Sequence, residues 1–299
     1  MKRVFVFMLV NFAILIMLSI TTSVLFALIG ANLESVFGEW AYLACFSLVL
    51  GFGGAMISLL LSKPIAKWSV GAKTIDGTEG EAERWLVATV AELAQLANLK
   101  TPEVAIYRGS ANAFATGAFK NHALIAVSTD IMQQMTKEEL RAVLGHEMSH
   151  VANGDMVTMC LAQGVLNTFV IFLSRIAAYA ASRAIAERSE RASRASSSWT
   201  YYLFIHLFEF ALGLLASIVT CWYSRKREYA ADAGSARLLG SPSSMIAALR
   251  RLGNLKPGIL PDSIKAFGIA SAKRRESLFS THPALEHRIE ALQNLTRGI

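Results

Sequence analysis

Four long apolar segments constrain this 299-residue chain more than any other feature of its sequence. They cover about residues 4–30, 40–61, 156–180 and 201–223. Each can cross the hydrocarbon core of a bilayer, for which about 20 helical residues suffice. The first is longer than the apolar core of a signal peptide, about 7–15 residues, so we expect an uncleaved anchor. The sequence therefore predicts a mainly α integral membrane protein with four transmembrane helices.

The charges that flank these segments predict how the chain is oriented. Basic residues precede the first segment and follow the second and fourth, at Lys2, Arg3, Lys63, Lys67, Lys73, Arg225, Lys226 and Arg227. Because cytoplasmic loops are rich in Lys and Arg, we place these flanking parts in the cytoplasm. The net charge of +7 then reflects topology, and we predict the lipid bilayer, and no nucleic acid, as a partner.

Two features of the third and fourth segments leave alternatives open. The loop over residues 181–200 is rich in arginine although it should lie outside. Either it crosses the membrane despite its charge, or the two segments form a hairpin that does not span fully. His206 and Glu209 share a helical face within the fourth segment. Ionisable residues within a membrane span either mark a functional site or pair with each other on the side of the helix that faces the bundle, and we favour the pair.

The rest of the chain has the pattern of a domain with a small β-sheet. We predict helices over about 79–98, 136–151, 225–239, 243–253 and 284–296, and strands over 103–107, 113–116 and 123–127. Thr136 and Glu139 form a capping box at the start of the second helix. The chain thus divides into a membrane hairpin (1–62), a first cytoplasmic part (63–155), a second hairpin (156–223) and a second cytoplasmic part (224–299).

The strongest chemical signal is the run His146-Glu147-Met148-Ser149-His150 on one of these helices. Histidines at positions i and i+4 lie one turn apart on the same side, so both imidazoles can bind one Zn²⁺. Glu147 lies close to such a metal without binding it, and can move a proton from water to a leaving amine. The alternative is a surface helix with two solvated histidines, which fits the apolar surroundings less well.

A catalytic zinc ion needs a third protein ligand and one open position. The three cysteines all lie in the apolar segments, so we expect a carboxylate. Glu228 is the best candidate, because the chain returns to the same membrane face after the fourth segment. Asp232 shares the helix face of Glu228, and its shorter side chain suits hydrogen bonding to a ligand imidazole. A solvated acidic pair at these two positions is the alternative.

Three other acidic residues compete with Glu228 for this place. Glu138 and Glu139 lie in the first turn of the helix that carries His146, where capping and the helix dipole explain them better. Asp155 follows a glycine after that helix, and its expected partners are backbone amides or a ligand imidazole.

The order of these motifs resembles that of the membrane zinc endopeptidases that include HtpX and the CAAX-prenyl proteases. The shared pattern comprises Asn112–Gly117, His146-Glu147-x-x-His150, His150–Asp155, Glu228-x-x-x-Asp232 and Thr281-His282-Pro283. The resemblance implies a zincin-type (His-His-Glu) α+β catalytic domain that faces the cytoplasm and degrades damaged membrane proteins under stress. It also implies that Asp232 orients His146, and that His282 and Arg288 contact the reacting peptide.

Two of these motifs have weaker support when they are considered without the resemblance. The predicted substrate-binding residues are Asn112, Ala113, Phe114, Ala115 and Gly117. They fit an edge strand to which an extended substrate adds, or an ordinary hairpin strand. His282 could donate to a developing oxyanion, or the His-Pro pair could open the helix that contains Arg288.

We therefore predict a zinc metalloendopeptidase of the cytoplasmic (inner) membrane, with one Zn²⁺ per chain and misfolded membrane proteins or unfolded polypeptides as substrates. A prenyl-protein processing protease is the nearest alternative, because the sequence does not distinguish a broad pocket from one tuned to a lipidated C-terminus. The alternative outside the enzymes is a membrane sensor or transporter that binds zinc and does not hydrolyse peptides. Glu147 has no evident role in such a protein.

Overall fold

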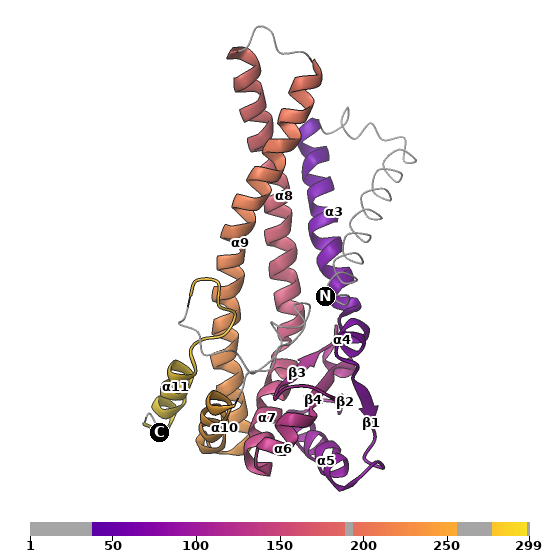
Figure 1. Ribbon diagram of the computed structural model, residues 1–299, viewed down its shortest axis with the longest axis vertical. Helices are drawn as coiled ribbons and strands as arrows, with labels where there is room; N and C mark the ends of the chain where they lie inside the picture. Colours follow the sequence, from indigo (N-terminus) through magenta and orange to yellow (C-terminus); the bar gives the residue numbers. More distant parts are fainter. Residues whose placement is uncertain (1–37, 189–193, 256–276, 298–299) are drawn as a thin grey trace. The chain divides into compact units, whose positions relative to one another are not determined.

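The computed structural model describes residues 38–188, 194–255 and 277–297 and is mainly helical (Figure 1). The chain forms two compact units. We call Ser58–Met159 together with the chain from Cys221 onward the sheet unit. The described residues before Ser58, together with Cys160–Thr220, are the helical unit. Two long helices, α8 (Asp155–Arg188) and α9 (Arg194–Leu239), contribute residues to both units.

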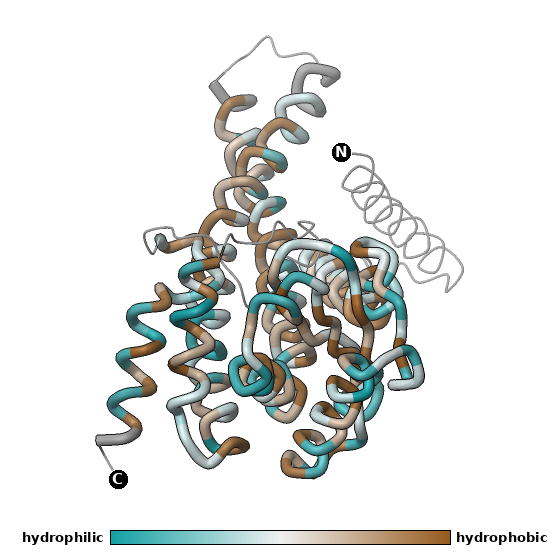
Figure 2. The backbone as a smooth tube through the Cα atoms, turned by 60° about the horizontal axis from the view of Figure 1, so that its bottom comes forward, coloured by the Kyte–Doolittle hydropathy of each residue, from teal (hydrophilic) through white to brown (hydrophobic). Residues whose placement is uncertain are grey.

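Three described helices are long and apolar enough to cross a membrane, namely α3 (Glu39–Leu60), α8 and α9. The second, third and fourth apolar segments are therefore confirmed as helices, and the predicted first span, 4–30, lies outside the described residues. Figure 2 shows hydrophobic residues recurring along the long helices. Large apolar side chains on them are exposed, such as Phe169 at 57% and Phe210 at 68%, which suits contact with lipid.

The helix predicted over 225–239 is confirmed, and it continues the fourth apolar segment within α9 without a break. The chain changes there from apolar to basic residues. Polarity alone does not end a helix, and no glycine or proline lies between Gly213 and Gly234. At 46 residues, α9 is about 69 Å long with ~1.5 Å of rise per residue, well beyond the ~30 Å of a bilayer core.

Small residues and one ion pair join the helices of the helical unit. A Cβ atom at Gly164 would lie 2.9 Å from the ring of Phe52, so glycine permits the close approach of α3 and α8. Arg175 Nη1 lies 3.2 Å from Glu209 Oε1 and thereby links α8 to α9. His206 Nδ1 lies 3.4 Å from Glu209 Oε2, as predicted, but its side chain is 76% exposed. The prediction that His206 faces the bundle is therefore wrong.

The sheet unit contains a four-stranded mixed sheet in the order β1-β2-β4-β3. Its strands are β1 (Lys73–Ile75), β2 (Glu103–Tyr107), β3 (Ala113–Thr116) and β4 (Leu124–Ser128). β2 and β4 are parallel, whereas β1 pairs with β2 and β3 pairs with β4 in antiparallel register. The three predicted strands are confirmed, as is the hairpin of β3 and β4, whose connection contains the short 3₁₀ helix η1 (Lys120–His122). The sequence did not predict β1, which has only three residues, two of them polar.

Helices cover both faces of this sheet and enclose a continuous core. One face packs against α5 (Glu81–Leu96), α7 (Lys137–Asn153) and α10 (Ser243–Asn254), and the other against α4 (Ser62–Val70). Two further helices, α6 (Thr129–Gln134) and α11 (Leu285–Arg297), complete the unit. Ile125 and Val127 of β4 face the first core, while Leu124 and Ala126 face the second, as alternation along a strand requires.

Helix α7 is fixed at both ends by its sequence. Thr136 Oγ1 accepts from the Glu139 amide at 3.2 Å, and Glu139 Oε2 accepts from the Thr136 amide at 2.9 Å, which confirms the predicted capping box. The helix ends at Gly154, whose φ of +70° is readily adopted only by glycine. The side chains of Leu144 and Met148 on one side of α7 are buried in the core, and this packing holds the helix beside the sheet.

Candidate metal centre

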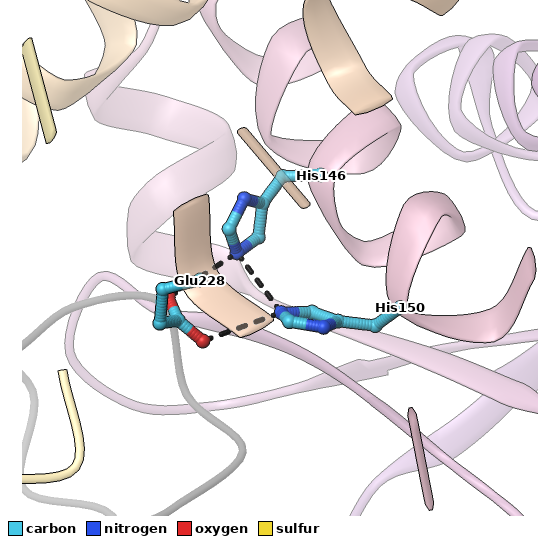
Figure 3. A group of neighbouring side chains, drawn as sticks. All are labelled: His146, His150 and Glu228. Carbon is cyan, nitrogen blue, oxygen red and sulfur yellow. Dashed lines mark hydrogen bonds and ion pairs between the residues drawn. The ribbon is translucent and has the colours of Figure 1, made fainter. Parts of the chain in front are cut away.

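Helix α7 places His146 and His150 one turn apart and buries both, with 1% and 6% of their surfaces exposed. Their Nε2 atoms face each other at 3.1 Å. Glu228 of α9 completes the group, because its Oε2 lies 3.5 Å from His146 Nε2 and its Oε1 lies 3.4 Å from His150 Nε2. Figure 3 shows the carboxylate and both rings converging on one point. All three residues belong to the sheet unit.

A carboxylate behind each histidine selects the ring form that can bind a metal. His146 Nδ1 lies 2.9 Å from Asp232 Oδ1, and His150 Nδ1 lies 2.5 Å from Asp155 Oδ2. Each carboxylate accepts the Nδ1 proton, so the lone pair of the neutral ring lies on Nε2. Of the two partners predicted for Asp155, the structure shows the ligand imidazole.

The geometry and chemistry of this donor set fit a zinc ion. Two Nε2 lone pairs and a carboxylate repel one another at 3.1–3.5 Å unless a cation lies between them. Ligands that surround Zn²⁺ tetrahedrally at about 2.0–2.2 Å lie roughly 3.3–3.5 Å from each other. The observed separations therefore leave the space of one such ion. Imidazole and carboxylate ligands in this ratio are typical of catalytic zinc sites.

The charges around the site also favour a divalent cation. Four buried carboxylates and two guanidinium groups belong to it, namely Glu147, Asp155, Glu228, Asp232, Arg227 and Arg288. With neutral histidines, these groups sum to two negative charges when all are ionised. Burying such an excess is unfavourable, and one divalent cation neutralises it.

The histidines respond to the same negative surroundings. Burial alone would lower the pKa of each imidazole, but the neighbouring carboxylates outweigh it. Hydrogen bonds to Asp232 and Glu228 raise the pKa of His146, and those to Asp155 and Glu228 raise the pKa of His150 to about 10. The site therefore attracts positive charge, which is what a metal ion supplies.

Glu147 lies next to the metal ligands in sequence but is not one of them. Its carboxyl group is buried, and neither oxygen has a hydrogen-bond partner among the described residues. Burial raises its pKa to about 7. A buried carboxyl group that titrates near neutrality can both accept and release a proton, which is what a general acid–base needs.

His282 and Arg288 also reach the ligand group, from the C-terminal part of the chain. His282 Nδ1 lies 3.0 Å from Glu228 Oε2, and the His282 side chain is 6% exposed. Arg288 is buried and donates from Nε and Nη2 to Asp232 at 2.7 and 2.6 Å. Its Nη1 lies 3.2 Å from Glu228 Oε2. The structure thus places Arg288 behind two carboxylates of the site, where it fixes both.

The predicted substrate-binding segment forms the edge of the sheet beside α7. Asn112 pairs with Ser128 through two hydrogen bonds of 2.9 Å, so in the antiparallel register Ala113 and Ala115 direct their backbone groups away from β4. Asn112 Oδ1 accepts the Ala113 amide at 2.9 Å. The conformation of Gly117, with a φ of +135°, also explains why glycine is needed there.

A shallow apolar recess, open to solvent, adjoins both this edge and His150. Its lining comes from the turn after β3 and from the residues around the junction of α7 and α8, and includes Thr116, Ala118, Phe119, Val151, Met156 and Val157. Phe119 is 60% exposed. The recess could take an apolar side chain of a peptide that lies along β3.

Sequence reasoning missed two arginines that organise the site. Arg227 Nε lies 3.3 Å from Asp155 Oδ2. Arg225 Nη1 donates to the backbone oxygen of Ser280 at 2.7 Å and thereby fixes the turn before His282. Both belong to the basic run that we attributed to topology alone. The run of three basic residues directly before Glu228 could have drawn attention to them.

Comparisons with known proteins agree with this geometry. The sequence profile of Peptidase family M48 matches residues 81–296. The Protease HtpX homolog of Verminephrobacter eiseniae is 50% identical over 299 residues, which cover 98% of this chain and 99% of that protein. The Protease HtpX homolog of Bordetella pertussis is 49% identical over 305 residues, which cover all of both chains.

A solved structure shares the fold. The crystal structure of S. mikatae Ste24p matches with a TM-score of 0.55 and 17% sequence identity. The match covers 98% of this chain and 67% of that one. At this identity the likeness shows a common fold alone.

Proposed function

Because the chain belongs to peptidase family M48, we propose that it binds Zn²⁺ at His146, His150 and Glu228 and hydrolyses peptide bonds of misfolded membrane proteins or unfolded polypeptides. The membership and the His-His-Glu group make the chain a homologue of zinc metallopeptidases. The buried Glu147 carboxyl group carries the proposal, because it lies beside the metal ligands and binds none of the described side chains.

Each residue of the site has a distinct task in this reaction. When bound, zinc supplies Lewis-acid activation of water and of the substrate carbonyl group. Glu147 accepts a proton from the attacking water and delivers it to the leaving amine nitrogen. Asp232 and Asp155 hold the two imidazoles with Nε2 toward the metal. His282, whose Nδ1 lies 3.0 Å from Glu228 Oε2, can donate from Nε2 to the developing oxyanion.

We further propose that the substrate binds as an added strand along β3. The outward carbonyl groups of Ala113 and Ala115 are suited to accepting from the amides of an extended peptide, whereas the Ala113 amide already donates to Asn112 Oδ1. Such a peptide would lie across the ligand group, and the apolar recess beyond Thr116 would take one of its side chains. Extended backbone is common to unfolded chains, so this mode of binding suits a protease with broad specificity.

The proposed location is the cytoplasmic membrane, with the sheet unit in the cytoplasm and a role in protein quality control under stress. The basic residues that follow α3 and the apolar part of α9 support this orientation. Cysteines introduced at Lys73 and at Ala233 should then react with a membrane-impermeant thiol reagent only after the cells are opened. Labelling of either position in intact cells would reverse the orientation.

A direct test of the proposed activity uses the purified full-length protein in detergent. Wild-type protein loaded with zinc should cleave an unfolded substrate such as denatured casein, and a chelator should stop the reaction until zinc is restored. Zinc binding without any cleavage of unfolded or membrane substrates would instead favour a zinc sensor.

A further inference from the structure

A buried carboxylate supports the second histidine ligand from behind. Asp155 is the first residue of α8, directly after the glycine that ends α7. Its Oδ2 lies 2.5 Å from His150 Nδ1, and only 5% of the residue is exposed. Burying the charge of a carboxylate is strongly unfavourable unless a cationic partner compensates for it. Asp155 therefore needs a positive charge beside it.

Arg227 provides this charge. Its Nε lies 3.3 Å from the same Oδ2 atom, and its side chain is 12% exposed. Arg227 directly precedes Glu228 on α9, and successive helix residues point about 100° apart. Glu228 can therefore face the metal position while Arg227 reaches the carboxylate behind His150. One turn of α9 thus supplies a metal ligand and the partner of a group that orients another ligand.

The first histidine has comparable support, with hydrogen bonds where Arg227 makes an ion pair without hydrogen-bond geometry. His146 Nδ1 contacts Asp232, and Asp232 accepts two hydrogen bonds from Arg288. Each histidine ligand is thus backed by an aspartate, and each aspartate by an arginine. The parallel indicates that the contact between Arg227 and Asp155 belongs to the metal centre.

We propose that Arg227 is a positioning residue of this centre. Through Asp155 it holds the His150 ring in the tautomer and orientation in which Nε2 faces His146 and Glu228. Arg227 should therefore set the affinity for the metal ion as well as the rate of the reaction. This inference rests on the proposed zinc site.

Lys226 offers a matched control on the same helix. It carries the same charge as Arg227, but it is exposed and its Nζ lies 4.2 Å from the centre of the Trp222 ring. Lys226→Gln removes one positive charge at the same level of α9 without changing the surroundings of Asp155. Any effect of net charge alone should appear equally in Lys226→Gln and Arg227→Gln.

The experiment measures zinc affinity by competition with a chelator, on the full-length protein in detergent. Arg227→Gln should bind zinc about 10–100-fold more weakly, the range usual for residues behind metal ligands. Arg227→Lys should recover most of this loss, and Lys226→Gln should match the wild type. Cobalt in place of zinc gives a second measurement, because its visible absorption bands should shift in Arg227→Gln when the His150 ring is displaced.

A double variant tests whether Arg227 acts through Asp155. In the Asp155→Asn background, Arg227→Gln should add little further loss of zinc affinity. Unchanged zinc affinity and cobalt bands in Arg227→Gln, or a full additional loss in the double variant, would overturn the inference. Should Arg227→Gln not fold, Arg227→Met and Asp155→Asn take its place, and zinc affinity equal to wild type in either would contradict it. A wild-type protein that binds no zinc would instead overturn the proposed function.

Discussion

Glu228 and Asp232 lie one turn apart on α9 and are both buried acids, yet the structure gives them different tasks. Glu228 directs its carboxylate between the two Nε2 atoms, whereas Asp232 contacts Nδ1 on the far side of the His146 ring. Glu228→Ala should therefore remove a metal ligand, and Asp232→Asn should only disturb one. The two variants should therefore differ in how much zinc affinity they lose.

The magnitudes follow from the contacts. Structural zinc sites with four ligands bind with roughly 10–16 kcal/mol, or about 3–4 kcal/mol per ligand. Loss of Glu228 should therefore weaken zinc binding by roughly 100–1,000-fold, at 1.4 kcal/mol for each factor of ten. In Asp232→Asn the amide oxygen can still accept from His146, so the expected loss is about 10–100-fold.

The assay combines metal analysis with chelator competition on variants whose folding is checked by circular dichroism. That check matters for Asp232→Asn, because Arg288 loses a buried charged partner, although Glu228 remains at 3.2 Å. Removing one partner of a buried ion pair can cost about 3–5 kcal/mol. If Asp232→Asn loses its zinc while Glu228→Ala keeps it, the two roles must be exchanged.

Three further predictions concern the sheet unit. Hydrogen bonds from Lys63, Lys67 and Thr74 outweigh partial burial and lower the pKa of Glu103 from 4.5 to about 2. The ionised form thus stabilises the fold above about pH 4.5 and stops doing so as the pH falls to about 2. In unfolding experiments, Glu103→Gln should therefore lower the free energy of unfolding by about 1–2 kcal/mol at pH 7, after allowance for solvent screening, and by almost nothing below about pH 2. Gly117→Ala places a Cβ 2.9 Å from the His122 backbone oxygen at a φ of +135°, so it should lower the free energy of unfolding by about 2–3 kcal/mol. Gly109→Ala, whose Cβ would have its nearest contact at 3.5 Å, should lower it much less when both variants are measured by thermal unfolding. Ala118→Trp should fill the recess beside His150 and raise KM for casein several-fold, while zinc affinity stays unchanged. An unchanged KM would exclude the recess from substrate binding.

The local parts of this structure could be predicted because neighbouring residues determine them. Thr136 and Glu139 specify the start of α7, Gly154 specifies its end, and the helical repeat brings His146 and His150 together. Glu228 was predictable only through topology, because the chain had to return to the same membrane face.

The parts that could not be predicted depend on contacts between distant segments. The pairing of Arg227 with Asp155 joins the interior of α9 to the start of α8, and no periodicity in the sequence encodes it. The same is true of Arg225, which reaches the turn that precedes His282. Burial sets the pKa of Glu147, and burial depends on how β3, α7 and α9 pack. Such groups become visible only when the packing is known.

The central claim is that this site binds zinc and uses Glu147 to move protons. The most direct measurement compares wild type with Glu147→Gln for zinc content and for cleavage of denatured casein, on the same preparations. Both proteins should hold about one zinc ion per chain, because Glu147 is not a ligand. Only the wild type should cleave at an appreciable rate, with the variant slower by about 100–10,000-fold. Cleavage by the variant near the wild-type rate, or loss of zinc from it, would contradict the assignment of Glu147.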